Sequence, residues 1–473
     1  MFVTFEEARQ YLQEGNLRMV DLKYCDLWGR WHHVTVPASQ FTPALMEEGV
    51  GFDASSVGLK PLKAGDMVVV PDLSTGFVDP FWEAPTLSFI CSSKEADTLQ
   101  DFPRDPRNIA RRAEAYLQEL GIADESRWGP EFEFYIFDSV AFENEVHSVG
   151  YRLESAEGIW NSPKGGLGHY IPMHGGYHAH PPRDSLHNLR SEMCLHLEAM
   201  GVPIKYHHHE VGGPGQVEIE TPLMGLLESA DATMLVKYVA KMTAAAHNQT
   251  TTFMPKPLFG EAGNGMHFHQ MLIKGERSLF YNAQSYAGLS RMALHYIGGL
   301  LSHGSALLAF TNPSTNSFRR LVPGYEAPVN LFFSLGNRSA AVRIPLYACT
   351  PSQQRIEFRP PDATGNVYLS LAAQLMAGLD GIRQEIDPTE AGFGPFDTNV
   401  FEWSEKERAR IKGLPSSLGE ALEALAADHD FLLAGGVMDV EFIKDWIDYK
   451  MTYEHLQVRD RPHPYEMALY FDV

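Results

Sequence analysis

A ten-residue segment at 129–138, Gly-Pro-Glu-Phe-Glu-Phe-Tyr-Ile-Phe-Asp, constrains the fold of this chain more than any other stretch. Its aromatic and β-branched residues follow a Gly-Pro pair, which predicts a strand. Because side chains alternate along a strand, we expect Phe132 and Phe134 on one face, and Glu131 and Glu133 together on the other. Two neighbouring carboxylates repel each other when they are buried, and a divalent cation beside them would relieve the repulsion. The alternative is the solvated outer face of an edge strand.

Length and charge limit what the rest of the chain can be. A chain of 473 residues exceeds one ordinary core, so we expect about two to three domains. The formal net charge of -22 argues against nucleic acid and against an anionic membrane surface as partners, because both require basic surface. Four cysteines without a paired short spacing argue against a disulfide framework and a zinc ribbon. Neither an export signal nor a membrane-spanning apolar run is visible, so we expect a cytoplasmic protein.

The first hundred residues read as a small strand-rich unit. Alternating apolar stretches predict strands near 17–22, 31–36, 67–70 and 87–91. Between them, Asp53 lies in a turn-rich segment with two serines, which could bind a small cation or simply form a local cap. Asp105-Pro106 then supplies an N-cap and a first helical residue for a helix that runs to about Leu120. We therefore predict a domain at 1–102 and a second at 103–473.

Three later segments bring further potential metal ligands onto strands. A glycine-rich turn between Glu210 and Glu218 predicts two adjacent strands that carry these carboxylates toward each other. The histidines at 207–209 point to alternating faces, so we expect them mainly to pack or to support the ligands. On the strand 266–273, His267 and His269 share one face, and we consider a ligand role and a structural role equally open.

The remaining ligand, Glu357, shares a strand face with Arg359. Five carboxylates and one or two histidines suit two Mg²⁺ or Mn²⁺ ions better than zinc, because oxygen donors dominate and thiolates are lacking. Arginine binds phosphate and carboxylate with a planar fork of donors, and the same region holds Arg320, Arg338, Arg343, Arg355 and Arg359. Metals with arginines indicate phosphoryl transfer, although no phosphate-binding loop of the G-x-x-x-x-G-K-[ST] type occurs.

Seven motifs then resemble the type I glutamine synthetase family, in the order of that family and over essentially the whole chain. They are Gly-Pro-Glu-Phe-Glu-Phe, His-His-His-Glu with Gly-Gln-Val-Glu, Met-Pro-Lys-Pro, Gly-Met-His-Phe-His, Arg-Leu-Val-Pro-Gly-Tyr-Glu-Ala-Pro, Asn-Arg-Ser-Ala-Ala-Val-Arg-Ile-Pro and Arg-Ile-Glu-Phe-Arg-Pro-Pro-Asp. The resemblance implies an α+β fold. A small N-terminal β-grasp domain would precede a large catalytic domain, whose curved antiparallel sheet is flanked by helices.

The resemblance also implies an activity, the ATP-dependent amidation of glutamate by ammonium through γ-glutamyl phosphate. One metal would be bound by Glu133, Glu210 and Glu218, and the metal that bridges the ATP phosphates by Glu131, His267 and Glu357. The matching substrate positions are Tyr177, Gly263, Arg320 and Arg359, and the matching ATP positions are His269, Arg338, Arg343 and Arg355. Asp53, Glu326 and Arg338 match catalytic positions, with Glu326 on a flap that closes the site against water.

Assembly is part of what the resemblance implies. Asp53 would enter the site of a neighbouring subunit, and the family assembles as two stacked six-membered rings. The chain departs from the family pattern at Ala262 and Asn264 in the glutamate-binding loop, and the nucleotide side departs at Lys205, Met271 and Ser352. The alternative activity is that of a γ-glutamyl amine ligase on the same scaffold, which keeps the metals and the phosphoryl chemistry but accepts an organic amine. An inactive structural homologue is disfavoured because all six metal positions are filled.

Overall fold

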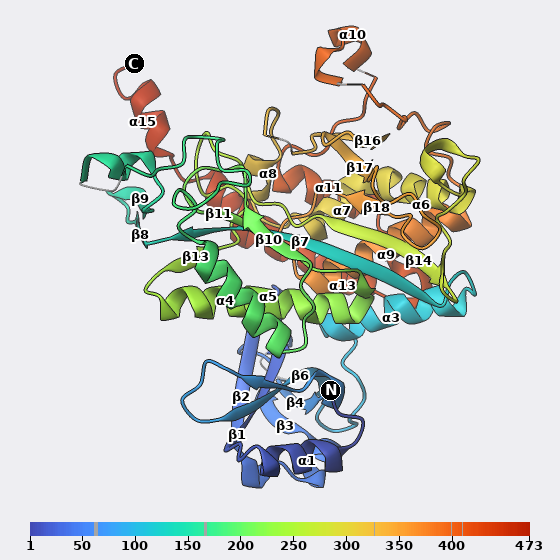
Figure 1. Ribbon diagram of the computed structural model, residues 1–473. Coiled ribbons are helices and arrows are strands. Elements are labelled where there is room, and N and C mark those ends of the chain that lie inside the picture. The colour runs from blue at the N-terminus through green and yellow to red at the C-terminus, as the bar shows by residue number, and fades with distance from the viewer. Residues whose placement is uncertain (61–64, 165–167, 326, 399, 409) are drawn as a thin grey trace.

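A computed structural model describes residues 1–60, 65–164, 168–325, 327–398, 400–408 and 410–473. In Figure 1 a small N-terminal unit lies below a larger body that contains all later elements. Helices α3 (Pro106–Glu119) and α5 (Leu226–Ala246) lie between the small unit and the long strands of the larger body. None of the described helices combines the length and apolarity that crossing a bilayer would require.

The small unit is a mixed sheet with the strand order β2-β1-β6-β4-β3, and β5 also pairs with β6. The pair β1–β6 is parallel and the other pairs are antiparallel. Its elements are α1 (Phe5–Glu14), β1 (Met19–Cys25), β2 (Trp31–Pro37), α2 (Pro43–Glu48), β3 (Val50–Asp53), β4 (Asp66–Pro71), β5 (Phe77–Asp79) and β6 (Thr86–Glu95). Helix α1 begins with a capping box between Thr4 and Glu7. The predicted strands are thus confirmed.

The larger body is built on a ten-stranded sheet with the order β10-β11-β7-β14-β18-β17-β16. Every pair along this path is antiparallel except β16–β17, which is parallel. The strands are β7 (Glu125–Phe137), β10 (Tyr206–His209), β11 (Gln216–Glu220), β14 (Phe268–Lys274), β16 (Asn330–Leu335), β17 (Ala340–Ile344) and β18 (Ile356–Phe358), with short β12 (Met224–Gly225), β13 (Thr250–Thr252) and β15 (Arg277–Ser278) at its margins.

One face of this sheet packs on helices and the other carries polar side chains. Phe132 and Phe134 of β7 are fully buried in the main core, as their alternation with the glutamates predicts. Helix α9 (Val367–Arg383) is buried along most of its length and packs on α3 and α6. The other helices are α4 (His187–Ala199), α6 (Arg291–Ser302), α7 (Gly304–Thr311), α8 (Ser317–Arg320), α10 (Glu405–Arg408), α11 (Leu418–Ala427), α12 (Asp430–Leu433), α13 (Val440–Lys450), α14 (Leu456–Arg459) and α15 (Pro464–Tyr470). The predicted α+β fold class is confirmed.

Several segments project from the larger body, among them helix α10 at the top right of Figure 1. The hairpin of β8 (Ser139–Asn144) and β9 (Val149–Glu154) and the C-terminal helix α15 both extend away from the core in Figure 1. Both expose large apolar side chains: Phe142 of β8 is 79% exposed, and Met467 of α15 and Phe471 directly after it are 53% and 85% exposed. These surfaces are unusual for a monomer, because large exposed apolar patches typically mark interaction sites.

Candidate active site

Strand register gathers one half of the candidate site on a single face of the sheet. In the β7–β11 pair, Glu133 is opposite Glu218, and Glu131 is opposite Glu220. In the β10–β11 pair, His208 is opposite Glu218. Directly opposed residues lie only about 5 Å apart between Cβ atoms, so this register alone brings the carboxylates and the imidazole into one cluster.

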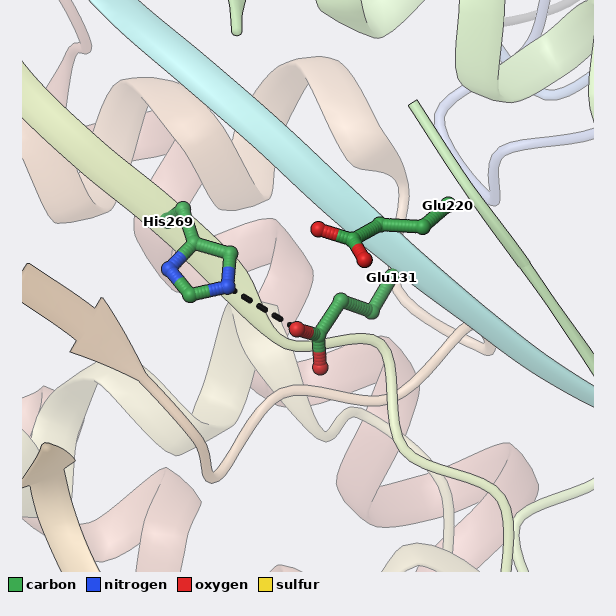
Figure 2. Close-up of side chains that lie close together, drawn as sticks. All are labelled: Glu131, Glu220 and His269. Atoms are coloured by element: carbon green, nitrogen blue, oxygen red, sulfur yellow. Dashed lines mark hydrogen bonds and ion pairs between the residues drawn. The ribbon is translucent and has the colours of Figure 1, made fainter. Parts of the chain in front are cut away.

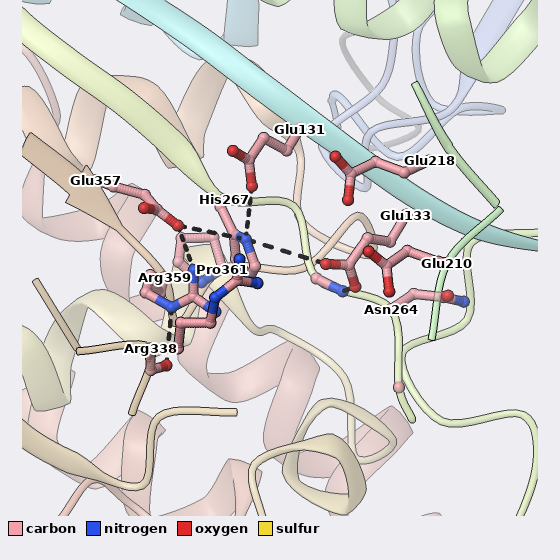
Figure 3. Close-up of polar contacts among 12 residues, drawn as sticks. Glu131, Glu133, Glu210, Glu218, Asn264, His267, Arg338, Glu357, Arg359 and Pro361 are labelled. Carbon is pink, nitrogen blue, oxygen red and sulfur yellow. Dashed lines mark hydrogen bonds and ion pairs between the residues drawn. The ribbon is translucent and has the colours of Figure 1, made fainter. Parts of the chain in front are cut away.

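The other half of the site comes from the next strands of the same sheet. His269 of β14 is opposite Gly129 of β7 and Glu357 of β18, and Arg343 of β17 is opposite Glu357. The Nδ1 atom of His267, just before β14, lies 2.9 Å from a Glu131 carboxylate oxygen and 3.6 Å from a Glu357 carboxylate oxygen. Figure 3 shows Glu131, His267 and Glu357 converging from separate segments of the chain.

The turn between β10 and β11 is held in place by a buried acid. Gly215 has φ +92, and a Cβ there would lie 2.2 Å from the carbonyl oxygen of Ile136, so only glycine fits. The Glu157 carboxylate accepts hydrogen bonds from the Gly215 and Ser185 backbone N–H groups at 3.0 and 2.8 Å, and it lies 3.1 Å from His209 Nε2. Glu157 thereby fixes the turn that carries Glu210 into the site. The predicted adjacent strands are confirmed.

The structure forms two groups of possible metal ligands here, in each of which one donor atom per residue lies within 4.8 Å of the others. The groups are Glu131, His267 and Glu357, and His208, Glu210 and Glu218. Glu133 lies beside both, since one of its oxygens is 4.0 Å from His267 Nδ1 and another accepts a hydrogen bond from the Gly265 N–H at 2.6 Å. His208 was expected mainly to pack or to support the ligands, and it lies close enough to Glu210 and Glu218 to be a ligand itself. Its position two residues before Glu210, on the same strand face, was the available signal.

Electrostatics differ sharply between the two groups. Burial would raise the pKa of Glu131, but hydrogen bonds with His267 and His269 hold it well below its usual value. In the other group, burial and the repulsion of Glu133 and Glu218 raise the pKa of Glu210 to about 9. The pKa of Glu218 is likewise raised by burial and by neighbouring carboxylates. No lysine or arginine of the described residues pairs with Glu210 or Glu218, and their basic neighbour is His208, whose Nε2 lies 3.5 Å from a Glu218 carboxylate oxygen; a hard cation would satisfy this environment.

A third cluster lies on the outer side of Glu131 and is shown in Figure 2. Glu131, Glu220 and His269 place one donor atom each within 4.8 Å of the others. His269 Nε2 lies 2.9 Å from a Glu131 carboxylate oxygen, and Lys205 Nζ lies 2.5 Å from a Glu220 carboxylate oxygen. The ammonium of Lys205 thus supplies the positive charge that an ion would otherwise bring.

Arginines form the wall that faces the carboxylates. Arg320 donates from Nη1 to the Pro360 carbonyl oxygen at 2.7 Å, and burial lowers its pKa. Arg343 Nη1 lies 2.5 Å from the Glu357 carboxylate, which also pairs with Arg359. Burial would raise the pKa of Glu357, but Arg359, His269 and His267 hold it at about 2, so this acid stays ionised.

A cavity of about 220 Å³ lies between the carboxylates and the arginines. The predicted site residues that line it are Glu131, Glu133, Tyr177, Glu210, Glu218, Gly263, His267, Arg320, Arg338, Arg343, Glu357 and Arg359. Tyr206, His208, Tyr325 and Tyr347 line it as well and were not predicted. His269 contacts the site through Glu131, and Glu326 is outside the described residues.

Two other predicted residues lie elsewhere. The Arg355 guanidinium lies over the Tyr347 ring at 5.4 Å and donates to the Gln353 carbonyl oxygen at 3.2 Å. Asp53 is exposed on the small unit, where its carboxylate accepts hydrogen bonds from the Ser55 N–H and hydroxyl at 2.9 and 2.6 Å. Within this chain Asp53 therefore forms a local cap, and it does not line the cavity of its own subunit.

The glycine-rich loop before His267 approaches the arginines closely. A Cβ at Gly263 would lie 2.4 Å from the Pro255 carbonyl oxygen and 2.8 Å from Arg320 Cγ. The Gln216 side-chain amide donates to the Gly263 carbonyl oxygen at 3.0 Å, which links the loop to β11. Glycine at this position is required for the loop to border the cavity.

Comparison with known proteins places the chain in a family. The model of the glutamine synthetase catalytic domain matches residues 103–470, and the model of the glutamine synthetase β-grasp domain matches residues 16–96. Glutamine synthetase from Nostoc sp. is 48% identical, over 99% of this chain and 100% of that protein. The protein of the same name from Streptomyces filamentosus is 45% identical over the full length of both chains.

Solved structures agree with these matches. The cryo-EM structure of Plasmodium falciparum glutamine synthetase is 28% identical, covers 99% of both chains and superposes with a TM-score of 0.88. A structure of GmaS in complex with ADP is 25% identical, covers 98% of this chain and 99% of that one, and has a TM-score of 0.80. Matches that span almost the entire sequence, together with the shared fold, show that this chain belongs to the glutamine synthetase family.

Proposed function

We propose that this protein joins glutamate and ammonium to form glutamine, with ATP phosphorylating glutamate to γ-glutamyl phosphate before the amine attacks. The observation that carries the proposal is one cavity in which six metal-type ligands face a wall of arginines. Its relatives at 45–48% identity bear the name glutamine synthetase, and a solved neighbour was determined with ADP.

The donor set fits two Mg²⁺ or Mn²⁺ ions, because the ligands are carboxylates and imidazoles and include no thiolate. Glu131, His267 and Glu357 would hold one ion, and Glu133, Glu210 and Glu218 the other. His208 lies close enough to Glu210 and Glu218 to join the second set. When bound, such ions neutralise the phosphate oxygens and orient the transferred group.

The arginines divide between two substrates. We propose that Arg320 and Arg359 bind the carboxylates of glutamate, and that Arg338 and Arg343 neutralise the charge that spreads over the transferring phosphoryl group. Glu357 supports this arrangement, because it pairs with both Arg343 and Arg359 and so fixes their guanidinium planes. Arg355 and His269 would contact ATP, whereas Tyr177 and Gly263 would border the glutamate and ammonium positions.

Water must be kept from an acyl phosphate, which hydrolyses readily. We assign this role to the flap that carries Glu326, whose carboxylate would also accept a proton from ammonium. Asp53 would complete the site of a neighbouring subunit. Its exposure on the small unit and its absence from the cavity of its own chain support a contribution between subunits.

The assembly we propose is a homo-oligomer of two stacked hexameric rings in the cytoplasm. The exposed apolar side chains of α15 and of the β8–β9 hairpin support an assembly, because a monomer would leave them in water. The domain division at 1–102 and 103–473 stays a prediction.

An assay of phosphate release tests the activity. Purified protein supplied with Mg²⁺, ATP and glutamate should release phosphate only when ammonium is added, and glutamine should form in equal amount. Parallel reactions in which organic amines replace ammonium distinguish glutamine synthesis from the ligation of an organic amine. Faster turnover with putrescine or methylamine than with ammonium would contradict glutamine synthesis and indicate a γ-glutamyl amine ligase. Release of phosphate without any amine would contradict both assignments.

A matched pair of variants links the activity to the cavity. Glu357→Gln removes the charge that both a cation and two arginines contact, so it should abolish phosphate release. Glu119→Gln changes an exposed carboxylate at the end of α3 and should leave the rate unchanged. Full activity of the Glu357 variant would exclude the proposed metal ligand.

A further inference from the structure

A second cavity, of about 510 Å³, lies where the small unit meets the catalytic body. Its walls come from the β1–β2 turn, from α5, from α13 and from the loops at 313–314 and 363–364. It shares no described lining residue with the candidate active site. Its volume lies within the range of about 300–1,000 Å³ that is typical of small-molecule sites.

The charged residues that line this cavity are strongly unbalanced. Among the described residues, four are basic and one is acidic, in a chain whose net charge is -22. The acid, Glu454, is already bonded to Lys450 at 2.5 Å. No described carboxylate lies within ion-pair distance of Arg30, Lys237 or Lys241. Three cations thus line one cavity without a matching anion.

These cations are close enough to affect one another. Burial and the neighbouring Lys241 lower the pKa of Lys237 to about 8, and burial and Arg30 lower the pKa of Lys241. The Nζ atom of Lys237 donates to the Ala363 carbonyl oxygen at 2.6 Å. Arg30 lies on the β1–β2 turn and the two lysines on α5, so a bound anion would connect the small unit to the catalytic body.

Flat aromatic side chains form another part of the wall. Trp28 stacks on Tyr449 with a centroid distance of 3.8 Å, and Trp31 lies 5.9 Å from Tyr238. All four residues line the cavity. The indole Nε1–H of Trp31 is buried and has no hydrogen-bond partner among the described residues. This unsatisfied donor lies in the same cavity wall as the cations and could donate to a bound ligand.

We propose that this cavity binds a small phosphomonoester that carries a flat ring, of the nucleoside monophosphate class. The phosphate dianion would contact Arg30, Lys237 and Lys241, because arginine and lysine are the usual donors to phosphate. The ring would lie against Trp31 and Tyr238, since Trp28 already stacks on Tyr449; aromatic side chains offer apolar and polarisable surfaces to a flat ring. A ligand held in this way stabilises the contact between the two parts of the chain and is separate from the nucleotide of the reaction.

Calorimetric titration of the assembled protein tests the site with three probes: uridine 5′-monophosphate, inorganic phosphate and uridine. The monophosphate should bind with a saturable isotherm, inorganic phosphate should bind more weakly, and uridine should not bind. The double variant Arg30→Ala/Lys241→Ala removes two cations from the solvent-accessible part of the cavity wall. This variant should lower the affinity for the monophosphate by about 30-fold or more, because charge-assisted hydrogen bonds to phosphate are stronger than hydrogen bonds between neutral groups.

Two controls separate this site from the catalytic cavity. Arg9→Ala/Lys444→Ala removes the same charge from exposed positions outside the cavity and should leave binding unchanged. Arg343→Ala changes the catalytic cavity and should also leave monophosphate binding unchanged. The proposal is overturned if the monophosphate does not bind, if uridine binds equally well, or if Arg343→Ala abolishes binding while Arg30→Ala/Lys241→Ala does not. Basal glutamine synthesis by the double variant should equal that of the parent protein.

Discussion

Replacing Glu210 with glutamine should change the stability of the protein in opposite directions with and without metal. In the ion-free site, burial, Glu133 and Glu218 raise the pKa of Glu210 to about 9, from an ordinary value near 4.5. Between these two values the folded protein holds a proton that the unfolded chain releases. The stability of the ion-free protein therefore falls as the pH rises through this window.

The size of the effect follows from the shift. A pH of about 7.5 lies roughly 3 units above the pKa of this carboxyl in the unfolded chain, and each unit corresponds to about 1.4 kcal/mol. Glu210 therefore destabilises the ion-free fold by up to about 4 kcal/mol at this pH. Glutamine has the same shape and no charge, so this penalty disappears in Glu210→Gln. Saturating Mg²⁺ should reverse the order, because a cation stabilises only the folded protein that binds it and the variant lacks one carboxylate ligand.

Thermal unfolding of the parent protein and the variant in EDTA and in Mg²⁺ provides the assay. In EDTA at about pH 8 the variant should be the more stable protein, at about pH 5 the two should be nearly equal, and in Mg²⁺ the parent protein should be the more stable. Glu119→Gln serves as the control for a change of one exposed charge. A variant that is less stable than the parent in EDTA at high pH, or equal stabilisation of both by Mg²⁺, would refute the reasoning.

Three further changes are predicted from the contacts. Burial opposes the charge on His303, but hydrogen bonds to Asp380 and Asp428 raise its pKa to about 9. The contribution of charged His303 to the free energy of unfolding is therefore complete below about pH 6.5 and disappears as the pH rises through 9. Because Asp428 is partly exposed, we expect His303→Gln to lower the free energy of unfolding in urea by only about 1–2 kcal/mol near pH 6, and by little near pH 10. Glu157→Gln should weaken Mg²⁺ affinity by about tenfold with unchanged circular dichroism, because residues that orient metal ligands have effects of this size. Arg343→Lys should lower kcat by about 100-fold while ATP binding in equilibrium dialysis is retained, since lysine lacks the planar fork.

The features of the fold that depend on the local residue pattern of a strand or helix could be predicted from the sequence. The alternation of Glu131 and Glu133 with the buried Phe132 and Phe134 follows from the period of a strand. The parallel pairing of β16 with β17 was not visible, because strand order is decided by contacts between distant segments.

The candidate site was also predicted only in part, because local pattern identifies its carboxylates and tertiary contacts decide its other members. The carboxylates were visible as strand residues. The placement of His208 opposite Glu218 was not visible, because the register of β10 on β11 is set by tertiary structure. The ion pair between Lys205 and Glu220 was not predicted either, because it depends on the pairing of β10 with β11. The cation cluster of the second cavity could not be predicted either, because Arg30 and Lys241 are more than 200 positions apart in the chain.

A crystal structure of the Mn²⁺-loaded protein with an anomalous difference map tests the central claim most directly. The account predicts two peaks per subunit, one among Glu131, His267 and Glu357 and one among the carboxylates of Glu210 and Glu218. The absence of both peaks, or a single peak at the outer cluster of Glu220 and His269 instead, would contradict it.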